Sequence, residues 1–465
     1  MPGIRRAEEG LLLPARRKID TSCAQDESQE WSPEAVARKA LHGALALGLR
    51  QAIVQGLNFV GTIFLARLLS PSEFGVYAVI AFILSFLIAF GDAGLGASLV
   101  RQVEEPSRDD YRSIFTVQQM MVVAVVGVFW LAARQVAQAY HLPAEGAWVF
   151  RLVALSLLFT SFQVIPWIHL ERHLEFDKLA VVEMGMALVY NGSVVALAWK
   201  GLGVMSFALG LVARSLTGAI LANLVRPWRI GWTWQWERVR QHLRFGIPYQ
   251  GISVISLLKD SMTPVFIGLL LGTAQVGYLN WASMVAAYPV LALMALQRVY
   301  VPAFSRMQTH PESLGRFVER VLGATNGLVA PLAVLSFVLI EPLTRTLFGD
   351  KWLVALPLYN LLWLANVFVP TATPLLALLN ALGHSRTAFA FAAVWMLATW
   401  ILGVPLIVLF GTIGFAVANL GVQFTNLLLY RAAQAKLPFR ILPSVAPVWA
   451  LAGPSACSRQ RGLTA

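Results

Sequence analysis

Apolar residues run along this chain in long stretches, and short segments rich in glycine, proline or charge separate them. Ser113–Ala133 and Thr387–Tyr430 contain no charged residue at all. A helix needs about 20 apolar residues to cross the hydrocarbon core of a bilayer. The pattern therefore predicts a polytopic membrane protein with twelve transmembrane helices. Their expected limits are residues 43–69, 72–97, 114–138, 148–169, 179–199, 202–225, 247–271, 275–299, 321–348, 353–382, 387–410 and 412–431.

The longest internal connection divides these spans into two sets of six. It reads PWRIGWTWQWERVRQHLRF (227–245), and its mixture of tryptophan and arginine favours the headgroup zone of a membrane. We expect an all-α protein with two parallel six-helix bundles around a central cleft. The expected segments are a disordered cytosolic extension at 1–42, an N-terminal bundle at 43–225, a cytosolic amphipathic linker at 226–246, a C-terminal bundle at 247–432 and a cytosolic tail at 433–465.

Lysine and arginine are distributed unevenly between the two ends of the predicted spans. Of the 36 in the chain, 27 fall on the side that holds both termini and the linker, and 5 fall on the other side. Because positively charged loops stay in the cytosol, both termini are expected there. The formal net charge of +12 follows from this bias, suits an anionic inner leaflet and requires no nucleic acid as a partner.

The composition narrows the function classes further. Only 13% of the residues are charged, whereas about 25% is usual for a soluble domain. The two cysteines, Cys23 and Cys457, lie in the predicted tails, which excludes a disulfide framework and a cysteine metal site. His169, Glu171 and His173 lie together, but nothing completes a metal site around them. No phosphate-binding loop is present, so neither ATP as a direct fuel nor any cofactor is expected.

A hairpin between the first two spans has a counterpart in the second half. In LLSPSEFGVY (68–77), Ser70 and Glu73 form a capping box with Pro71 at the first helical position, so a new helix begins there. LLGTAQVGYL (270–279) aligns with it, and Gly75 coincides with Gly277. Glycine at these positions allows close packing of helices. The match favours an internal repeat, which is typical of transporters.

Four stretches of the predicted membrane portion stand out: LARLLSPSEFGVYAVIAFILSFLIAFGDAGLGASLVRQ (65–102), LERHLEFDKLAVVE (170–183), HLRFGIPYQGISVISLLKD (242–260) and LLGTAQVGYLNWAS (270–283). In this order, they resemble bacterial polysaccharide (O-antigen type) flippases of the multidrug/oligosaccharidyl-lipid/polysaccharide (MOP) exporter superfamily. The resemblance implies a transporter in the bacterial inner membrane. It would move a polyprenyl-diphosphate-linked oligosaccharide from the cytoplasmic to the periplasmic leaflet, with a polysaccharide polymerase and glycosyltransferases as partners.

A diphosphate and a glycan would need a wet, cationic cleft, and charges inside spans usually face such an interior. Arginine suits phosphate because its planar fork donates two hydrogen bonds at once. Arg151 lies close to the end of its span, so snorkelling to the interface is an alternative to substrate binding. For Arg298, near the cytosolic end of its helix, the alternative role is to help set the orientation of the protein in the membrane. The candidate substrate-binding residues are Arg50, Arg151, Arg214, Lys259 and Arg298.

Three acids inside spans are candidates for ion coupling or for charge pairing: Asp92, Glu183 and Asp260. Adjacent positions on a helix point about 100° apart, so Lys259 and Asp260 are not expected to pair face to face. Asp260 would instead pair with an arginine of another helix. Asp92 lies in GDAGLG (91–96), where the glycines are expected to allow close helix packing.

Two other functions remain alternatives. A drug/cation antiporter of the same superfamily would favour acids over arginines in its cleft, whereas the charge excess inside these spans is basic. A membrane-embedded polysaccharide polymerase or ligase would be expected to carry a large catalytic loop outside the membrane. The longest outward segment here, residues 135–146, is too short for that. We therefore expect a transporter rather than an enzyme.

Overall fold

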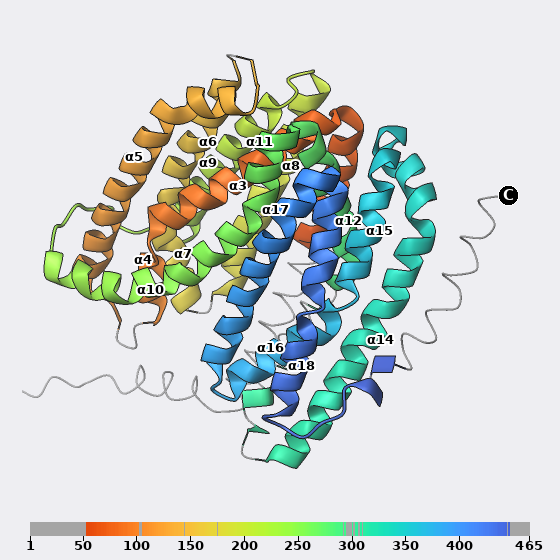
Figure 1. Cartoon of the computed structure of the whole chain (residues 1–465). Coiled ribbons are helices and arrows are strands. Elements are labelled where there is room, and N and C mark those ends of the chain that lie inside the picture. The colour runs from red at the N-terminus through yellow and green to blue at the C-terminus, as the bar shows by residue number, and fades with distance from the viewer. Residues whose placement is uncertain are drawn as a thin grey trace, which may run out of the picture.

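Figure 1 shows a computed structural model of the chain. It describes residues 53–446 except for 102–104, 144, 174, 292, 294–299, 301–302, 306, 309 and 444. Helices make up most of this part of the chain, and no strand occurs within it. The all-α class expected from the sequence is confirmed. The predicted extension at 1–42 lies outside the described residues.

The described part begins with the helix Ile53–Leu68. The helices that follow it lead to an irregular segment at residues 226–235. They are α3 (Pro71–Asp92), α4 (Leu95–Arg101), α5 (Arg108–Ala139), α6 (Gly146–Ser161), α7 (Val164–Arg172), α8 (Phe176–Trp199) and α9 (Met205–Val225).

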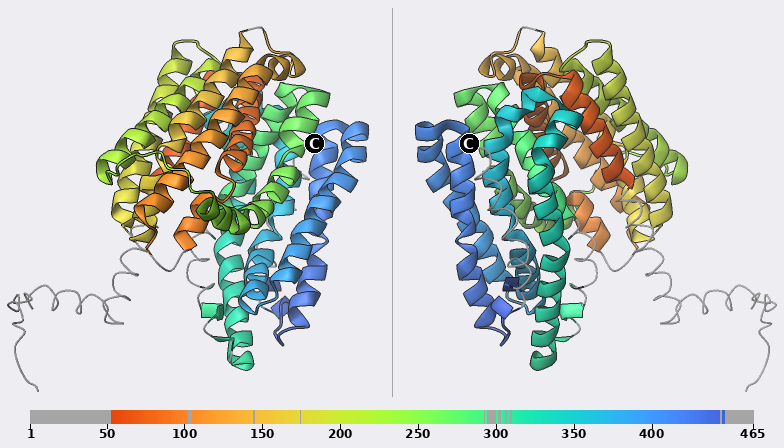
Figure 2. Two further views of the ribbon diagram at one scale, coloured as in Figure 1. Left: turned by 90° about the vertical axis from the view of Figure 1, so that its left-hand side faces the viewer. Right: turned by 90° about the vertical axis from the view of Figure 1, so that its right-hand side faces the viewer.

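The second part of the chain begins with α10 (Trp236–Asp260), which continues into a π-helical turn. In the views of Figure 2, α5–α9 lie on one side of the molecule and α14–α18 on the other. The elements after α10 are η1 (Met262–Ile267), α11 (Gly268–Leu271), α12 (Thr273–Leu291), α14 (Pro311–Leu343), η2 (Thr344–Phe348), η3 (Asp350–Ala355), α15 (Leu356–Asn366), α16 (Val369–Ala381), α17 (Ser385–Gln423) and α18 (Asn426–Gln434).

The described helices are long and apolar enough for a polytopic membrane protein. Eight of them can cross a bilayer, or nine if α6 and α7, which are bent by 45° relative to each other, form one span. α17 is interrupted at Gly411, whose φ of 61° and ψ of −140° are not helical, and this break lies between the last two predicted spans. The number twelve and the division into two six-helix bundles stay predictions.

The expected capping box at the start of α3 is confirmed. The backbone N–H of Ser70 donates to Glu73 Oε2 at 2.8 Å, and the backbone N–H of Glu73 donates to Ser70 Oγ at 3.3 Å. These bonds satisfy amide groups that have no partner within the helix, and Pro71, in the first turn, has no N–H that needs one. The chain therefore turns sharply between Leu68 and Pro71.

The two matching hairpins pack against each other. A Cβ added to Gly75 would overlap the carbonyl oxygen of Thr273, and one added to Gly277 would overlap the carbonyl oxygen of Pro71. Gly75 thus permits close packing, but its partner is α12 rather than the helix before it in the chain. We call this end of the molecule the hairpin face, and the opposite end, with residues 226–235, the linker face.

Two large clusters of buried apolar residues hold the helices together. One joins α3, α5, α6 and α9 around Phe150 and Phe207. The other is centred on Trp281 and Trp352, whose rings stack at 5.5 Å, and it includes Phe74 from α3. The second core therefore extends across to the first part of the chain, next to the hairpin face.

Candidate functional site

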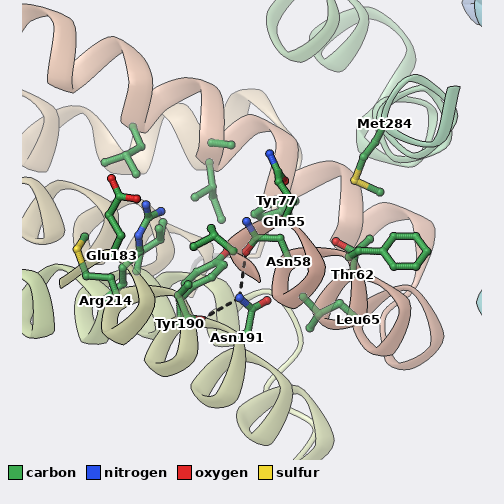
Figure 3. Close-up of a pocket in the computed structure, with 18 of the residues that line it drawn as sticks. Gln55, Asn58, Thr62, Leu65, Tyr77, Glu183, Tyr190, Asn191, Arg214 and Met284 are labelled. Carbon is green, nitrogen blue, oxygen red and sulfur yellow. Dashed lines mark hydrogen bonds between the residues drawn. The ribbon is translucent and has the colours of Figure 1, made fainter. Parts of the chain in front are cut away.

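A cavity of about 820 Å³ lies between the first part of the chain and α12. Its walls come from the helix Ile53–Leu68 and from α3, α7, α8, α9 and α12 (Figure 3). Along α3 its lining extends from Phe74 to Ile88, and at 1.5 Å per residue this is about 21 Å. The cavity therefore extends through much of the thickness of a bilayer core of about 30 Å. We call it the central cavity.

The lining is polar on the side of the first part of the chain. Arg214 is the only cation and Glu183 the only anion among the described residues that line the cavity, and the two side chains lie next to each other in Figure 3. The guanidinium of Arg214 lies 5.8 Å from the centre of the Tyr190 ring. The uncharged polar residues of the lining are Gln55, Asn58, Thr62, Tyr77, Ser85, Tyr190, Asn191 and Tyr288.

This arrangement suits a polar ligand with a negative charge. Arg214 can donate two hydrogen bonds to a phosphate, and the amides, hydroxyls and aromatic rings around it offer contacts to sugar. The pocket wall from α12 is mostly apolar, with Met284, Ala287 and Leu291. The charged side chains of the described cavity wall, Glu183 and Arg214, therefore come from α8 and α9.

The hairpin face is closed by contacts between the two parts of the chain. Ser72 Oγ and Thr273 Oγ1 are hydrogen-bonded at 2.7 Å. Lys351 Nζ donates to the carbonyl oxygens of Arg67 and Leu69 at 2.9 and 2.6 Å, and the indole N–H of Trp352 donates to Ala66 O at 2.9 Å. Arg67 in turn donates to the carbonyl oxygens of Thr346 and Leu347. These bonds satisfy the carbonyls at a helix end and join the two parts there.

A second polar cavity, of about 410 Å³, lies entirely in the second part of the chain. Lys259 lines it together with residues of α16, α17 and α18, such as Thr373, Asn419 and Asn426. Lys259 and Arg214 therefore line different cavities. The sequence predicted both as cleft residues, but the structure does not bring them together.

The expectation that Lys259 and Asp260 do not pair is wrong. Lys259 Nζ lies 3.1 Å from Asp260 Oδ1. The long, flexible lysine stem explains the contact, because it can swing around the helix towards the neighbouring carboxylate.

Arg151 and Asp92 do not line the central cavity. The guanidinium of Arg151, on α6, lies 5.7 Å from the ring of Trp130 and 4.9 Å from that of Trp148. Asp92, at the end of α3, accepts the backbone N–H of Gly96 at 3.3 Å and a weak bond from Gln118 at 3.5 Å. Arg50 and Arg298 lie outside the described residues.

A family model described as "Polysaccharide biosynthesis protein" matches residues 64–357. The chain belongs to this family. The match covers the helices that form the central cavity, apart from residues 53–63, which make up most of the helix Ile53–Leu68.

Curated relatives agree with this assignment. The succinoglycan biosynthesis transport protein ExoT of Rhizobium meliloti is 27% identical over 345 residues, which are 74% of this chain and 69% of the relative. The lipopolysaccharide biosynthesis protein WzxC of Escherichia coli is 24% identical over 404 residues, which are 84% of this chain and 80% of the relative.

Solved structures show the same fold. The lipid II flippase MurJ in an inward closed conformation matches with a TM-score of 0.74 at 14% identity, over 87% of this chain and 91% of that one. An inward-facing MATE family transporter of the MOP superfamily matches with a TM-score of 0.63 at 14% identity, over 84% and 98%. This polysaccharide biosynthesis family member thus has the fold of MOP superfamily transporters.

Sequence reasoning missed most of the uncharged residues that line the central cavity. Asn58 and Asn191 come from helices far apart in the chain, and Asn191 Nδ2 donates to Asn58 Oδ1 at 3.0 Å. Both lie in the middle of apolar runs, where an amide is costly unless it finds a partner. A search for isolated amides inside spans, rather than for charges alone, finds this pair.

Proposed function

We propose that this protein is a flippase for a polyprenyl-diphosphate-linked oligosaccharide. It moves this lipid from the cytoplasmic to the periplasmic leaflet of the bacterial inner membrane, for the biosynthesis of a surface polysaccharide. Glycosyltransferases supply the substrate and a polysaccharide polymerase consumes the product. The names of ExoT and WzxC, both polysaccharide biosynthesis proteins, support the substrate class.

One observation carries the proposal: among the described residues, the polar side of the central cavity holds one arginine, Arg214 on α9. A lipid-linked oligosaccharide presents a diphosphate, a polar glycan and an apolar tail. Arg214 binds the diphosphate, and the amides and tyrosines around it bind the glycan. A cation or drug substrate would not require this guanidinium.

The distribution of lysine and arginine supports cytosolic termini, which would make the hairpin face periplasmic. The contacts of Arg67, Lys351 and Trp352 then close the periplasmic end, and the substrate enters from the cytosolic side. Translocation requires these contacts to break, so that the two parts of the chain separate at the hairpin face. Glu183, beside Arg214, is the acid best placed to pair with this arginine or to couple transport to an ion. Asp92 and Asp260 do not line the central cavity.

The proposal is tested in cells that lack the chromosomal gene. Spheroplasts are treated with periodate, which does not cross the membrane, and the oxidised fraction of the lipid-linked oligosaccharide is measured. Cells with the native protein should expose most of this pool, and Arg214→Ala should lower the exposed fraction at least tenfold. Arg134→Ala, which removes an exposed arginine of α5 outside the cavity, is the matched control. Equal exposure in cells with and without the native protein would refute the proposal.

A further inference from the structure

A third cavity, of about 650 Å³, opens on the outside of the molecule between the helix Ile53–Leu68 and α8. Among the described residues, its lining is apolar except for one amide side chain. Val60, Phe64, Leu188 and Trp199 are each at least half exposed in the structure, as is expected of side chains that face hydrocarbon. We call this cavity the lateral groove. Its full lining is Leu57, Val60, Gly61, Phe64, Leu68, Leu188, Asn191, Gly192, Val195, Ala196 and Trp199.

The one polar side chain of the lateral groove also lines the central cavity. Asn191 belongs to both, and its amide donates to Asn58 Oδ1 at 3.0 Å and to the carbonyl oxygen of Ala187 at 2.9 Å (Figure 3). Asn58 lines the central cavity from the facing helix. This hydrogen-bonded pair of amides therefore lies where the polar interior and the apolar groove meet.

Gly61 makes room for this pair. A Cβ added to Gly61 would overlap Asn191 Oδ1, so the asparagine side chain fits into the notch that the glycine leaves. Gly61 lies one turn from Asn58 on the same helix. Asn58 accepts a hydrogen bond from the Asn191 amide, and Gly61 leaves space for that amide. Hydrogen bonds between membrane helices are modest in strength, so such a contact can open and close. A pair of leucines would seal the wall more firmly.

The groove also has a defined place along the membrane normal. From Leu57 to Leu68 the helix rises about 16 Å, which is about half of a bilayer core of about 30 Å. Leu68 and Trp199 mark its end at the hairpin face. The groove therefore lies beside the leaflet on that side, which is the periplasmic leaflet in the orientation proposed above.

We propose that the lateral groove holds the first part of the polyprenyl chain while the head group occupies the central cavity, and that the Asn58–Asn191 bond is the latch of a lateral exit into the periplasmic leaflet. This inference rests on the proposed function. The occupant follows from the chemistry of the two cavities. A ligand with a polar head and an apolar tail needs a polar space joined to an apolar one, and Asn191 is where these two meet.

Photo-crosslinking tests the occupant. The photoreactive residue p-benzoylphenylalanine replaces Val60 in the groove or, as a control, Leu224, an exposed leucine of α9 that does not line the groove. The protein is placed in nanodiscs with radiolabelled polyprenyl-diphosphate-linked oligosaccharide and illuminated. Labelling at position 60 should exceed that at position 224 at least fivefold and should persist in excess phospholipid. Equal labelling at both positions would mean that the groove is ordinary lipid-facing surface and would overturn the proposal.

The latch is tested by two glycine substitutions on one helix. Gly61→Ala displaces the Asn191 amide, whereas nothing lies within 4 Å of a Cβ added at Gly56. We expect Gly61→Ala to change the rate at which the oligosaccharide becomes exposed at least fivefold and Gly56→Ala to leave it unchanged. The same rate in both variants would overturn the latch. A native protein that exposes no oligosaccharide would refute the proposed function itself, and this inference with it.

Discussion

At the scale of single residues, the charges inside the spans have different environments. Arg214 lines the central cavity. Lys259 pairs with Asp260 and lines the second polar cavity, in the second part of the chain. Arg151 instead lies against two tryptophan rings. Sequence alone could not separate them, because an arginine within an apolar run reads the same whether it faces a cavity, an aromatic pair or the interface.

Arg151 should act on stability rather than on transport. Its contacts with Trp130 and Trp148 are cation–π interactions, each worth about 0.5–2 kcal/mol. We expect Arg151→Gln to lower the free energy of unfolding by about 1–2 kcal/mol, measured by unfolding in mixed micelles. Exposure of the oligosaccharide should stay close to that of the native protein. A transport defect as large as that of Arg214→Ala would show that Arg151 belongs to the site.

At the scale of helices, α3 and α12 meet where the sequence showed matching hairpins. The resemblance between the two segments was visible, and so was the need for glycine at residues 75 and 277. The direct contact between the two segments was not visible in the sequence, because a repeat shows which elements correspond and not which elements are in contact. The break of α3 at Ala93 and Gly94 was also missed, since apolar residues continue on both sides of it.

Gly75→Ala should weaken the closed hairpin face. The added methyl overlaps the Thr273 carbonyl, and such overpacking costs about 1–3 kcal/mol. That cost shifts an open–closed equilibrium about 5- to 150-fold. A cysteine placed at Ser72, in a protein whose two native cysteines are serine, should react faster with a membrane-impermeant maleimide by at least fivefold. Gly127→Ala, with nothing within 4 Å of its added Cβ, should not change the rate. Equal rates in both variants would contradict the assigned contact.

The contact of α10 with α4 at the linker face should depend on pH. His242 lies on α10, and its Nδ1 and Ser98 Oγ are 2.9 Å apart. Burial lowers the pKa of His242 below its ordinary value, although the nearby Asp110 opposes this effect. The docked state therefore favours the neutral ring. Docking should be at full strength above about pH 6.5 and weaken as the pH falls through that value.

Hydrogen exchange of the first turns of α10 measures this dependence. The native protein should exchange faster in these turns at pH 5.5 than at pH 7.5, after correction for the intrinsic pH dependence of exchange. His242→Gln should remove most of the difference, because glutamine does not titrate. A pH response that survives in the glutamine variant would assign it to another group.

At the scale of the whole molecule, the sequence predicted the membrane class, the helical fold and the family, and each is confirmed. Long uncharged runs indicate membrane-spanning helices, because charged side chains are costly in the hydrocarbon core of a bilayer. The central cavity was harder to predict, since its lining comes from six helices and most of its polar residues are uncharged. The hydropathy of a segment is high whether it is buried in lipid or in protein. It therefore does not show whether an amide such as that of Asn191 lines a cavity or lies in a packed core.

The most direct measurement of the proposed activity uses the purified protein in liposomes. A polyprenyl-diphosphate-linked oligosaccharide is placed in both leaflets, and a glycosidase that cleaves it is added outside. With the native protein, nearly the whole pool should be cleaved, because the inner half reaches the outer leaflet. In liposomes without protein or with Arg214→Ala, cleavage should stop at about half. Cleavage that stops at half with the native protein as well would contradict the proposal that this chain is a lipid-linked oligosaccharide flippase.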